Sequence, residues 1–342
     1  MPNFSTAEWV KAQPKLIGKF QANELRFRDP VVHKLYLKNS QIMVPSYMEL
    51  RNSVDRTVEA NFFIRTSRAL GSAISHNHTG AQGDSSTLTP TWTTYTDEFV
   101  STLKEANNTI YDLNELHVSK IENSIINFVE GLESAAAAFN FANRTGVNVS
   151  TTNGSFNVVD DTFEIIEATH VDSAIQITKS VMDDNKYQGI GFTIVCDAQS
   201  FILFEAQANQ GTGNSTNLSF QYSNVTFIKD VDLAAAASGL VAAYSKGYWI
   251  VVPDGYVAAL PWIPIQNRTG EDMKEAVYSN MFNPIDGIQL GTHTYETRVD
   301  GTALGGQLQD VKIETQLFTD LAYEVAPDST ATATPLFAFA LV

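Results

Sequence analysis

The stretch that decides the fold is residues 111–146, YDLNELHVSKIENSIINFVEGLESAAAAFNFANRTG. Asp112 is placed to cap a helix, and Glu115 follows three residues later, which is the spacing of a capping box. Tyr111 and Leu116 occupy the two positions of a hydrophobic staple around that start. The sequence therefore predicts a helix that begins at residue 112.

Apolar residues recur three or four positions apart along this stretch, which is helical periodicity. They are Leu116, Ile121, Ile125, Phe128, Leu132, Ala135, Phe139 and Ala142. The run Asn143–Gly146 supplies a basic last turn and a glycine at which the helix should end. A helix over 112–143 would be roughly 45 Å long, about three times the mean for globular proteins. We interpret it as a structural spine, although one long amphipathic helix of any α+β protein has the same pattern.

The charge of the chain is unevenly distributed. The 342 residues carry a formal net charge of −16 and are 44% hydrophobic, enough for two domains with cores. Residues 1–70 hold 11 Lys and Arg against 6 Asp and Glu (+5), and the remainder holds 11 against 32 (−21). An acidic body argues against a nucleic-acid-binding surface, because phosphate affinity comes from clustered Lys and Arg. A cationic leading segment suits contact between copies of the chain, although a chance bias in an ordinary acidic protein would look the same.

Cysteine content and the N-terminus limit the class of protein. The single cysteine, Cys196, excludes an intrachain disulfide framework and a cysteine zinc cluster. Residues Met1–Ser5 contain no basic region followed by an apolar run, so we expect no secretory signal. No run of about 18 apolar residues occurs, so we expect no membrane span and a soluble intracellular product. Without a secretory signal, the many Asn-x-Ser/Thr sequons carry no glycosylation message.

The segments before the predicted helix differ in character. Residues 1–57 hold short amphipathic pieces between prolines, with no sustained period, and we expect an extended arm that docks on something else. Residues 58–70 are typical of a strand, 71–87 of a glycine-rich tip, and 88–103 of a returning strand. Together they predict a long two-stranded ribbon. Because such a ribbon is barely stable alone, we expect a neighbouring subunit to cover it.

Alternating strands and helices follow the predicted helix. Strands are expected at 162–167, 191–196 and 217–229, and helices at 172–184 and after Asp197, which should cap the second. Residues 247–252 and 256–260 predict a tight hairpin through Pro253-Asp254-Gly255. At the C-terminus, strands at 311–325 and 334–342 are expected to pair beside the strand that precedes Asp172. The pattern indicates a compact α+β unit.

A search for catalytic and ligand sites gives no candidate. Neither GxxxxGK[ST] nor GxGxxG nor GxSxG occurs. Cys196 lies in an apolar strand and is interpreted as an inert thiol. His76 and His78 lie in the glycine-rich tip with Asp84 as nearest carboxylate, a weak metal pattern. His117 and His170 are expected to be partly exposed, and the pairs Asp160-Asp161 and Asp183-Asp184 to be solvated ends of elements. We therefore expect no enzyme, no catalytic residue, no cofactor and no metal.

The order of elements resembles that of tailed-bacteriophage major capsid proteins of the Hong Kong 97 fold. Residues Gly131–Ala136 resemble the end of that family's spine helix, 247–252 its axial-domain strands, and 311–342 its returning peripheral-domain strands. The resemblance covers nearly the whole chain, but it is one of element order and no single motif is diagnostic.

The resemblance implies a division of the chain. Residues 1–57 would be the N-terminal arm and 58–104 the E-loop. The peripheral domain would comprise 105–171 and 301–342, with the spine helix at 112–143, and the axial domain 172–300.

The resemblance also implies a function and partners. The chain would self-assemble, as hexamers and pentamers, into the icosahedral shell that encloses the double-stranded DNA of a tailed phage. Partners would be copies of itself, a portal, and decoration or scaffolding proteins, with non-specific contact to packaged DNA and no membrane. The location would be the virion, after assembly in the host cytoplasm.

Two alternatives remain open. An encapsulin-like non-viral shell protein has the same fold. A secreted or surface-displayed β-rich binding protein would account for the Thr- and Asn-rich strands and the sequons, although the missing signal and the long helix count against it.

Overall fold

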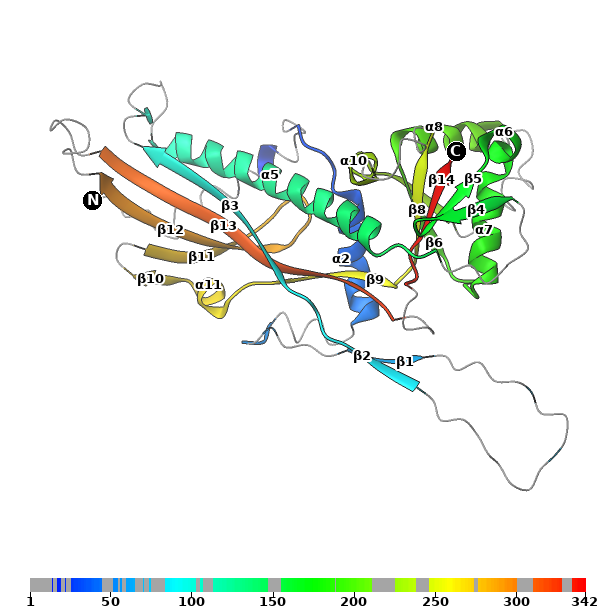
Figure 1. Ribbon diagram of the computed structural model, residues 1–342. Coiled ribbons are helices and arrows are strands. Elements are labelled where there is room, and N and C mark those ends of the chain that lie inside the picture. Colours follow the sequence, from blue (N-terminus) through cyan, green and yellow to red (C-terminus); the bar gives the residue numbers. More distant parts are fainter. Residues whose placement is uncertain are drawn as a thin grey trace.

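The computed structural model is an elongated α+β molecule in which a long helix lies along a long sheet and a compact unit is attached at one end (Figure 1). The residues described are 14, 17–19, 22, 26–44, 52–54, 56, 60–64, 70, 74, 84–102, 105–106, 113–146, 155–187, 189–210, 225–237, 246–273, 276–299, 310–327 and 334–342.

The predicted long helix is confirmed as α5, Leu113–Ala142, 30 residues long. Its inward face carries the expected apolar stripe, buried at Ile121, Ile125, Phe128, Val129, Leu132 and Ala136. Asp112, the predicted cap, lies outside the described residues. At the other end, Arg144 Nη1 donates to the Phe141 carbonyl (2.6 Å), so the basic residue satisfies one of the last free carbonyls as expected.

The predicted glycine stop has a different role. Gly146 lies beyond the helix, and a Cβ there would meet the Asp161 Cα and the Val158 side chain at 2.8 Å. The residue is therefore small because the turn between two later strands passes close to it.

The long sheet contains six strands. The main path runs β10 (Glu271–Met273), β11 (Ala276–Phe282), β12 (Gln289–Val299), β13 (Asp310–Val325) and β3 (Thr93–Thr102), and β9 (Val257–Trp262) pairs with the end of β13. All of these pairs are antiparallel. The short helix α11 (Ile265–Thr269) lies beside β11. Leu317, Leu321 and Tyr323 of β13 share one core cluster with the α5 stripe, so α5 covers one face of this sheet.

The compact unit is built on a second six-stranded sheet. Its order is β4 (Phe156–Val159), β5 (Thr162–Ile165), β14 (Phe337–Leu341), β8 (Tyr248–Pro253), β6 (Phe192–Cys196) and β7 (Val225–Lys229). The helical segments are α6 (Glu167–His170), η1 (Val171–Ser173), α7 (Ala174–Asp184), α8 (Ala198–Gln210) and α10 (Leu233–Ala237). Trp249 and Phe339 stack at the centre (5.8 Å between ring centroids). The predicted cap is confirmed, because the Ser200 N–H donates to Asp197 Oδ1 (2.8 Å).

Two predictions of strand pairing are wrong. The turn at Pro253-Asp254-Gly255 is present, with Gly255 at φ 82°, but β8 and β9 do not form a hairpin. β8 belongs to the compact sheet and β9 to the long sheet. The C-terminal strands also separate: β14 pairs with β5 as expected, whereas β13 pairs with β12, β3 and β9.

These pairings group the chain differently from the predicted domain boundaries at residues 172 and 300. Residues 156–165 and 337–341 lie in the compact sheet, which also holds β6, β7 and β8. Residues 257–262 and 271–299 lie in the long sheet with β3 and β13.

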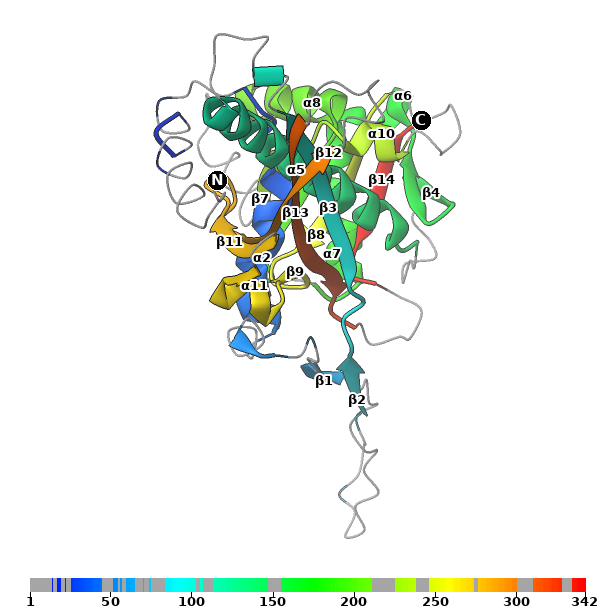
Figure 2. The same ribbon diagram turned by 90° about the vertical axis from the view of Figure 1, so that its left-hand side faces the viewer.

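The expected extended arm is wrong for residues 31–43. This segment is helix α2 (Val31–Met43), and it contacts β9 and α5 of its own chain. Val32 and Tyr36 are fully buried in the main core cluster, so α2 is part of the body of the molecule. Figure 2 shows α2 beneath α5 and beside β9.

A two-stranded ribbon is present as predicted, but its second strand lies at residues 84–88, almost entirely within the segment 71–87 that was expected to be the tip. β1 (Ala60–Ile64) pairs antiparallel with β2 (Asp84–Leu88), and both project away from the body (Figures 1 and 2). Most of the predicted returning strand, 88–103, is instead β3, which pairs with β13 of the long sheet and not with β1.

Candidate functional site

The cysteine and histidines that were weighed as a nucleophile or as metal ligands do not form a reactive site among the described residues. Cys196 is fully buried in β6, and burial raises the pKa of its thiol well above the ordinary value, as expected of an inert cysteine. His76 and His78 lie outside the described residues. Among the residues that the structure describes, no group of three or more His, Cys, Asp or Glu could hold a metal ion.

His117 departs from its prediction. It was expected to be partly exposed, but it is 3% exposed, and its Nδ1 lies 3.1 Å from Ser101 Oγ. Its ring packs at 5.3 Å from that of Phe99, because this face of α5 rests on β3. His170 is partly exposed, as predicted.

The pair Asp160 and Asp161 forms the exposed turn between β4 and β5, with φ of 46° and 55°. Arg144 Nε donates to the Asp160 carbonyl (3.0 Å), and the Gly146 N–H donates to Asp161 Oδ1 (3.2 Å). These contacts attach the turn to the end of α5. The two aspartates therefore serve structure, in agreement with their prediction as ends of elements.

A group of buried polar side chains lies where α2 rests on α5, and we call it the α2 seat. Pro30 precedes α2 and has no side chain that can cap the helix. Glu133 of α5 replaces the cap: its Oε1 accepts from the Val32 N–H (3.0 Å) and its Oε2 from the His33 N–H (2.9 Å). A carboxylate there also suits the positive end of the helix dipole. Its 4% exposure isolates it from water.

Further seat contacts come from α2, α5 and β13. Tyr323 donates from its hydroxyl to the Leu132 carbonyl (2.9 Å), and the same hydroxyl lies 2.8 Å from His33 Nδ1. Tyr36 donates to Asn140 Oδ1. On the remaining side, Asp286 Oδ2 lies 3.7 Å from His33 Nε2. The full set is His33, Tyr36, Leu132, Glu133, Asn140, Asp286 and Tyr323.

Burial changes the protonation of the carboxyl groups in and beside the seat. It raises the pKa of Glu133 to about 7, against the opposing effect of the two backbone N–H groups. It raises the pKa of Asp286 and of nearby Asp230 to about 6. The junction therefore contains several carboxyl groups that take up protons near neutral pH.

Cations from the segment before α2 lie against the acidic side of α5. Lys19 pairs with Glu122 (2.7 Å), and Arg28 pairs with Asp232 while its backbone N–H donates to Glu130 (3.2 Å). The positive charge predicted to meet other copies is thus partly used within the chain. Since Lys19 and Arg28 are 43% and 52% exposed, these pairs contribute little individually.

Two surfaces carry exposed apolar or aromatic side chains. On β1 and in the segment between β1 and β2, Phe63 is 95%, Leu70 100% and Ile74 98% exposed. On the long sheet, Tyr278, His293 and Tyr295 form a partly exposed aromatic row, with Tyr278 and His293 stacked at 4.6 Å. No helix of the described residues is long and apolar enough to cross a membrane.

Comparisons with known proteins give a fold and no sequence family. No protein-family model and no curated protein sequence matches the chain. Among solved structures, one from Mycobacterium phage Che8 is similar at a TM-score of 0.51 and 7% identity, over 88% of this chain and 90% of that one.

Two further structures are similar at lower scores. A cyanophage Pam1 capsid asymmetric unit matches at TM-score 0.48 and 10% identity, over 86% of this chain and 87% of that one. The capsid of Myoviridae phage XM1 matches at TM-score 0.47 and 11% identity, over 90% and 92%. The likeness to the Che8 structure establishes a shared fold over nearly the whole chain.

Proposed function

We propose that this chain is the major capsid protein of a tailed bacteriophage, and that copies of it assemble into the icosahedral shell around the genome. The observation that carries the proposal is the fold shared with a phage structure over 88% of this chain and 90% of that one. The long helix, the long sheet, the compact unit and the projecting ribbon stand in the order of the Hong Kong 97 fold, which supports it further.

Within this proposal, α5 is the spine helix and the long sheet with α5 and α2 is the peripheral domain. The compact unit, residues 155–253 and 334–342, is the axial domain. The ribbon β1–β2 is the E-loop, and the residues before α2 are the N-terminal arm. This assignment moves the domain boundaries to the places where the chain passes between the two sheets.

The exposed ribbon supports self-association as the mode of action. Phe63, 95% exposed on a five-residue strand, is left uncovered by the described residues of its own chain, so burial against another molecule would be favourable. Copies of the chain are the proposed partners, in hexamers and pentamers. A portal, decoration or scaffolding proteins and non-specific contact with packaged DNA follow from the same proposal, as do assembly in the host cytoplasm and residence in the virion.

The test is the state of the purified full-length chain. Size-exclusion chromatography and negative-stain microscopy should reveal capsomers or closed particles of megadalton mass. A small oligomer without particles would contradict a shell function and favour the β-rich binding protein. Particles that form closed shells in their native source but never contain DNA would favour the encapsulin-like compartment.

A variant makes the test specific to the ribbon. Phe63→Ala should reduce particle yield several-fold and leave the unfolding midpoint unchanged, because this side chain is almost wholly exposed in the isolated chain. Val54→Ala, a smaller apolar truncation at a side chain 62% exposed outside the ribbon, is the control and should assemble normally. Equal assembly of both variants would refute the ribbon's role.

A further inference from the structure

The α2 seat holds a pair of buried groups that are one proton short of a hydrogen bond. The side chains of His33 and Asp286 are both 0% exposed, and Nε2 of the first lies 3.7 Å from Oδ2 of the second. Neither atom has a hydrogen-bond partner among the described residues. Burying two polar atoms without hydrogen-bond partners costs free energy of folding, and a hydrogen bond between the two atoms would remove this cost.

The hydrogen-bond chain determines where the histidine proton lies. Tyr323 uses its only hydrogen to donate to the Leu132 carbonyl (2.9 Å), so it can only accept from His33 Nδ1 (2.8 Å). A neutral His33 therefore carries its proton on Nδ1 and presents the lone pair of Nε2 to Asp286.

The carboxyl group of Asp286 is fixed in the same way. Its Oδ1 accepts from the Ile288 N–H (3.0 Å), which leaves Oδ2 to face the imidazole. With Asp286 ionised, lone pair opposes lone pair. With Asp286 protonated, its O–H donates to Nε2 and both atoms are satisfied.

We propose that His33 and Asp286 form a one-proton lock that holds α2 against the body: the seat closes when the pair shares a proton and loosens when the proton leaves. This lock lies within a single chain and does not require shell formation.

Burial favours the carboxyl as the site of this proton. Burial lowers the pKa of His33 to about 3 and raises that of Asp286 to about 6. Lys34 of α2 lowers both pKa values, but it is already paired with Asp29 (2.5 Å). The lock is therefore closed below about pH 6 and open above it.

The other charged and titratable groups come from each neighbouring element. α5 contributes Glu133 beneath the first turn of α2, and β13 contributes Tyr323, whose pKa burial raises well above the ordinary value. The turn before α10 contributes Asp230 and Asp232, which face Arg28. Glu133 and Asp230 also take up protons near neutral pH, so the contribution of Asp286 is obtained by comparing variants.

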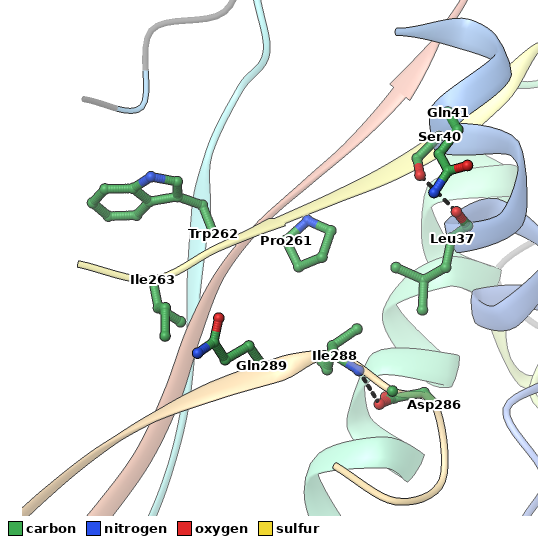
Figure 3. A pocket seen from close by; sticks show the side chains of 10 residues that line it. Leu37, Ser40, Gln41, Pro261, Trp262, Ile263, Asp286, Ile288 and Gln289 are labelled. Atoms are coloured by element: carbon green, nitrogen blue, oxygen red, sulfur yellow. Dashed lines mark hydrogen bonds between the residues drawn. The ribbon is translucent and has the colours of Figure 1, made fainter. Parts of the chain in front are cut away.

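A cavity beside the pair gives the lock room to open. It has a volume of about 150 Å³ and is lined by residues of α2, β9 and the turn into β12 (Figure 3). Asp286 lies at its edge, bonded to Ile288, and its side chain is 0% exposed, so a small displacement of this turn into the cavity would bring the carboxyl to water without unfolding of the body.

The test uses Asp286→Asn in the full-length chain. Asparagine keeps Oδ1 for Ile288 and supplies a permanent N–H for His33 Nε2, so it should lock the seat at every pH. Hydrogen exchange, corrected for intrinsic rates, gives the protection of the α2 amides at pH 5 and pH 8. The ratio of variant to wild-type protection should be roughly tenfold higher at pH 8 than at pH 5, because the pKa of Asp286 in the wild type is raised from 3.8 to about 6.

The control is Asp183→Asn, the same change at an exposed position on α7, which should follow the wild type at both pH values. A ratio that does not change with pH would overturn the lock. Failure of Asp286→Asn to fold would overturn it too, because the amide preserves both hydrogen bonds. Independently, the carboxylic-acid absorption in the infrared spectrum at pH 5 should be weaker by one group in Asp286→Asn than in the wild type, because Glu133 and Asp230 are protonated in both chains. Equal absorption in the two chains would also refute the proposal.

Discussion

Truncation of Leu132 to alanine should destabilise the chain strongly. Leu132 lies in the middle of α5, is 1% exposed and belongs to the main core cluster shared by α2, α5 and both sheets. Leucine-to-alanine changes at such sites cost about 2–5 kcal/mol, from lost transfer free energy plus the cavity that remains.

The structure places this site in the upper half of that range. How much a cavity costs depends on whether its neighbours can move into it. Tyr323 is held by its hydroxyl to the Leu132 carbonyl and to His33, and Tyr36 is held to Asn140. Because these large rings are fixed at both ends, the space should stay open, and we expect a loss of about 3–5 kcal/mol.

The assay is urea unfolding followed by both tryptophan fluorescence and circular dichroism. The midpoint should fall while the slope of unfolding free energy against urea concentration is unchanged. The slope reflects the surface exposed on unfolding, which should be nearly the same in the variant and the wild type. A loss below about 1 kcal/mol with an unchanged slope would refute the assignment of α5 as the central packing element.

Three further outcomes are expected. Gly131→Ala, beside Leu132 but exposed and with nothing within 4 Å of the added Cβ, should stabilise α5 by about 0.5–1 kcal/mol; a loss of stability would contradict its open surroundings. Burial raises the pKa of Glu133 from 4.5 to about 7, so its stabilising effect is complete below about pH 4.5 and is lost as the pH rises through 7. Glu133 alone should therefore contribute on the order of 2–3 kcal/mol in favour of pH 5 over pH 8 in urea unfolding. Asp286 and Asp230 add to it in the same direction, so equal stability at the two pH values would contradict the shifts. Deletion of residues 1–57 removes α2 and should prevent folding, whereas deletion of residues 1–25 should leave a soluble chain with native circular dichroism; a folded product of the longer deletion would show that α2 is dispensable.

The parts of the fold that could be predicted from the sequence are those with a local signal. α5 follows from periodicity over eight turns, and α8 from the cap at Asp197. The strands β5 and β6 follow from short apolar runs bounded by polar residues. Each of these patterns is complete within its own segment.

The failures concern contacts between distant segments. A turn signal at 253–255 predicts that the chain bends, but it cannot say whether the next strand returns to the last one. β9 instead finds β13, more than fifty residues later. α2 was missed because its inward face carries His33, Asn39 and Ser40, so that polar residues hide the amphipathic pattern.

The α2 seat could not be derived from sequence for the same reason. Glu133 and Asn140 read as exposed positions on a helix, and only the fold places them beneath α2. The one available signal was their position within the apolar stripe of α5. That the chain has no catalytic residue remains an expectation.

The short crossing from β8 to β9 determines how the two sheets can move. Only residues 254–256 separate the end of β8, in the compact sheet, from the start of β9, in the long sheet. Gly255 is the middle one of these residues, and a Cβ added to it would lie 3.1 Å from Ile42 Cγ2 of α2. Rotation of one sheet against the other must therefore change backbone torsion angles beside α2 or press on that helix. The packing of α2 against this connection therefore limits how far the compact sheet can rotate relative to the long sheet.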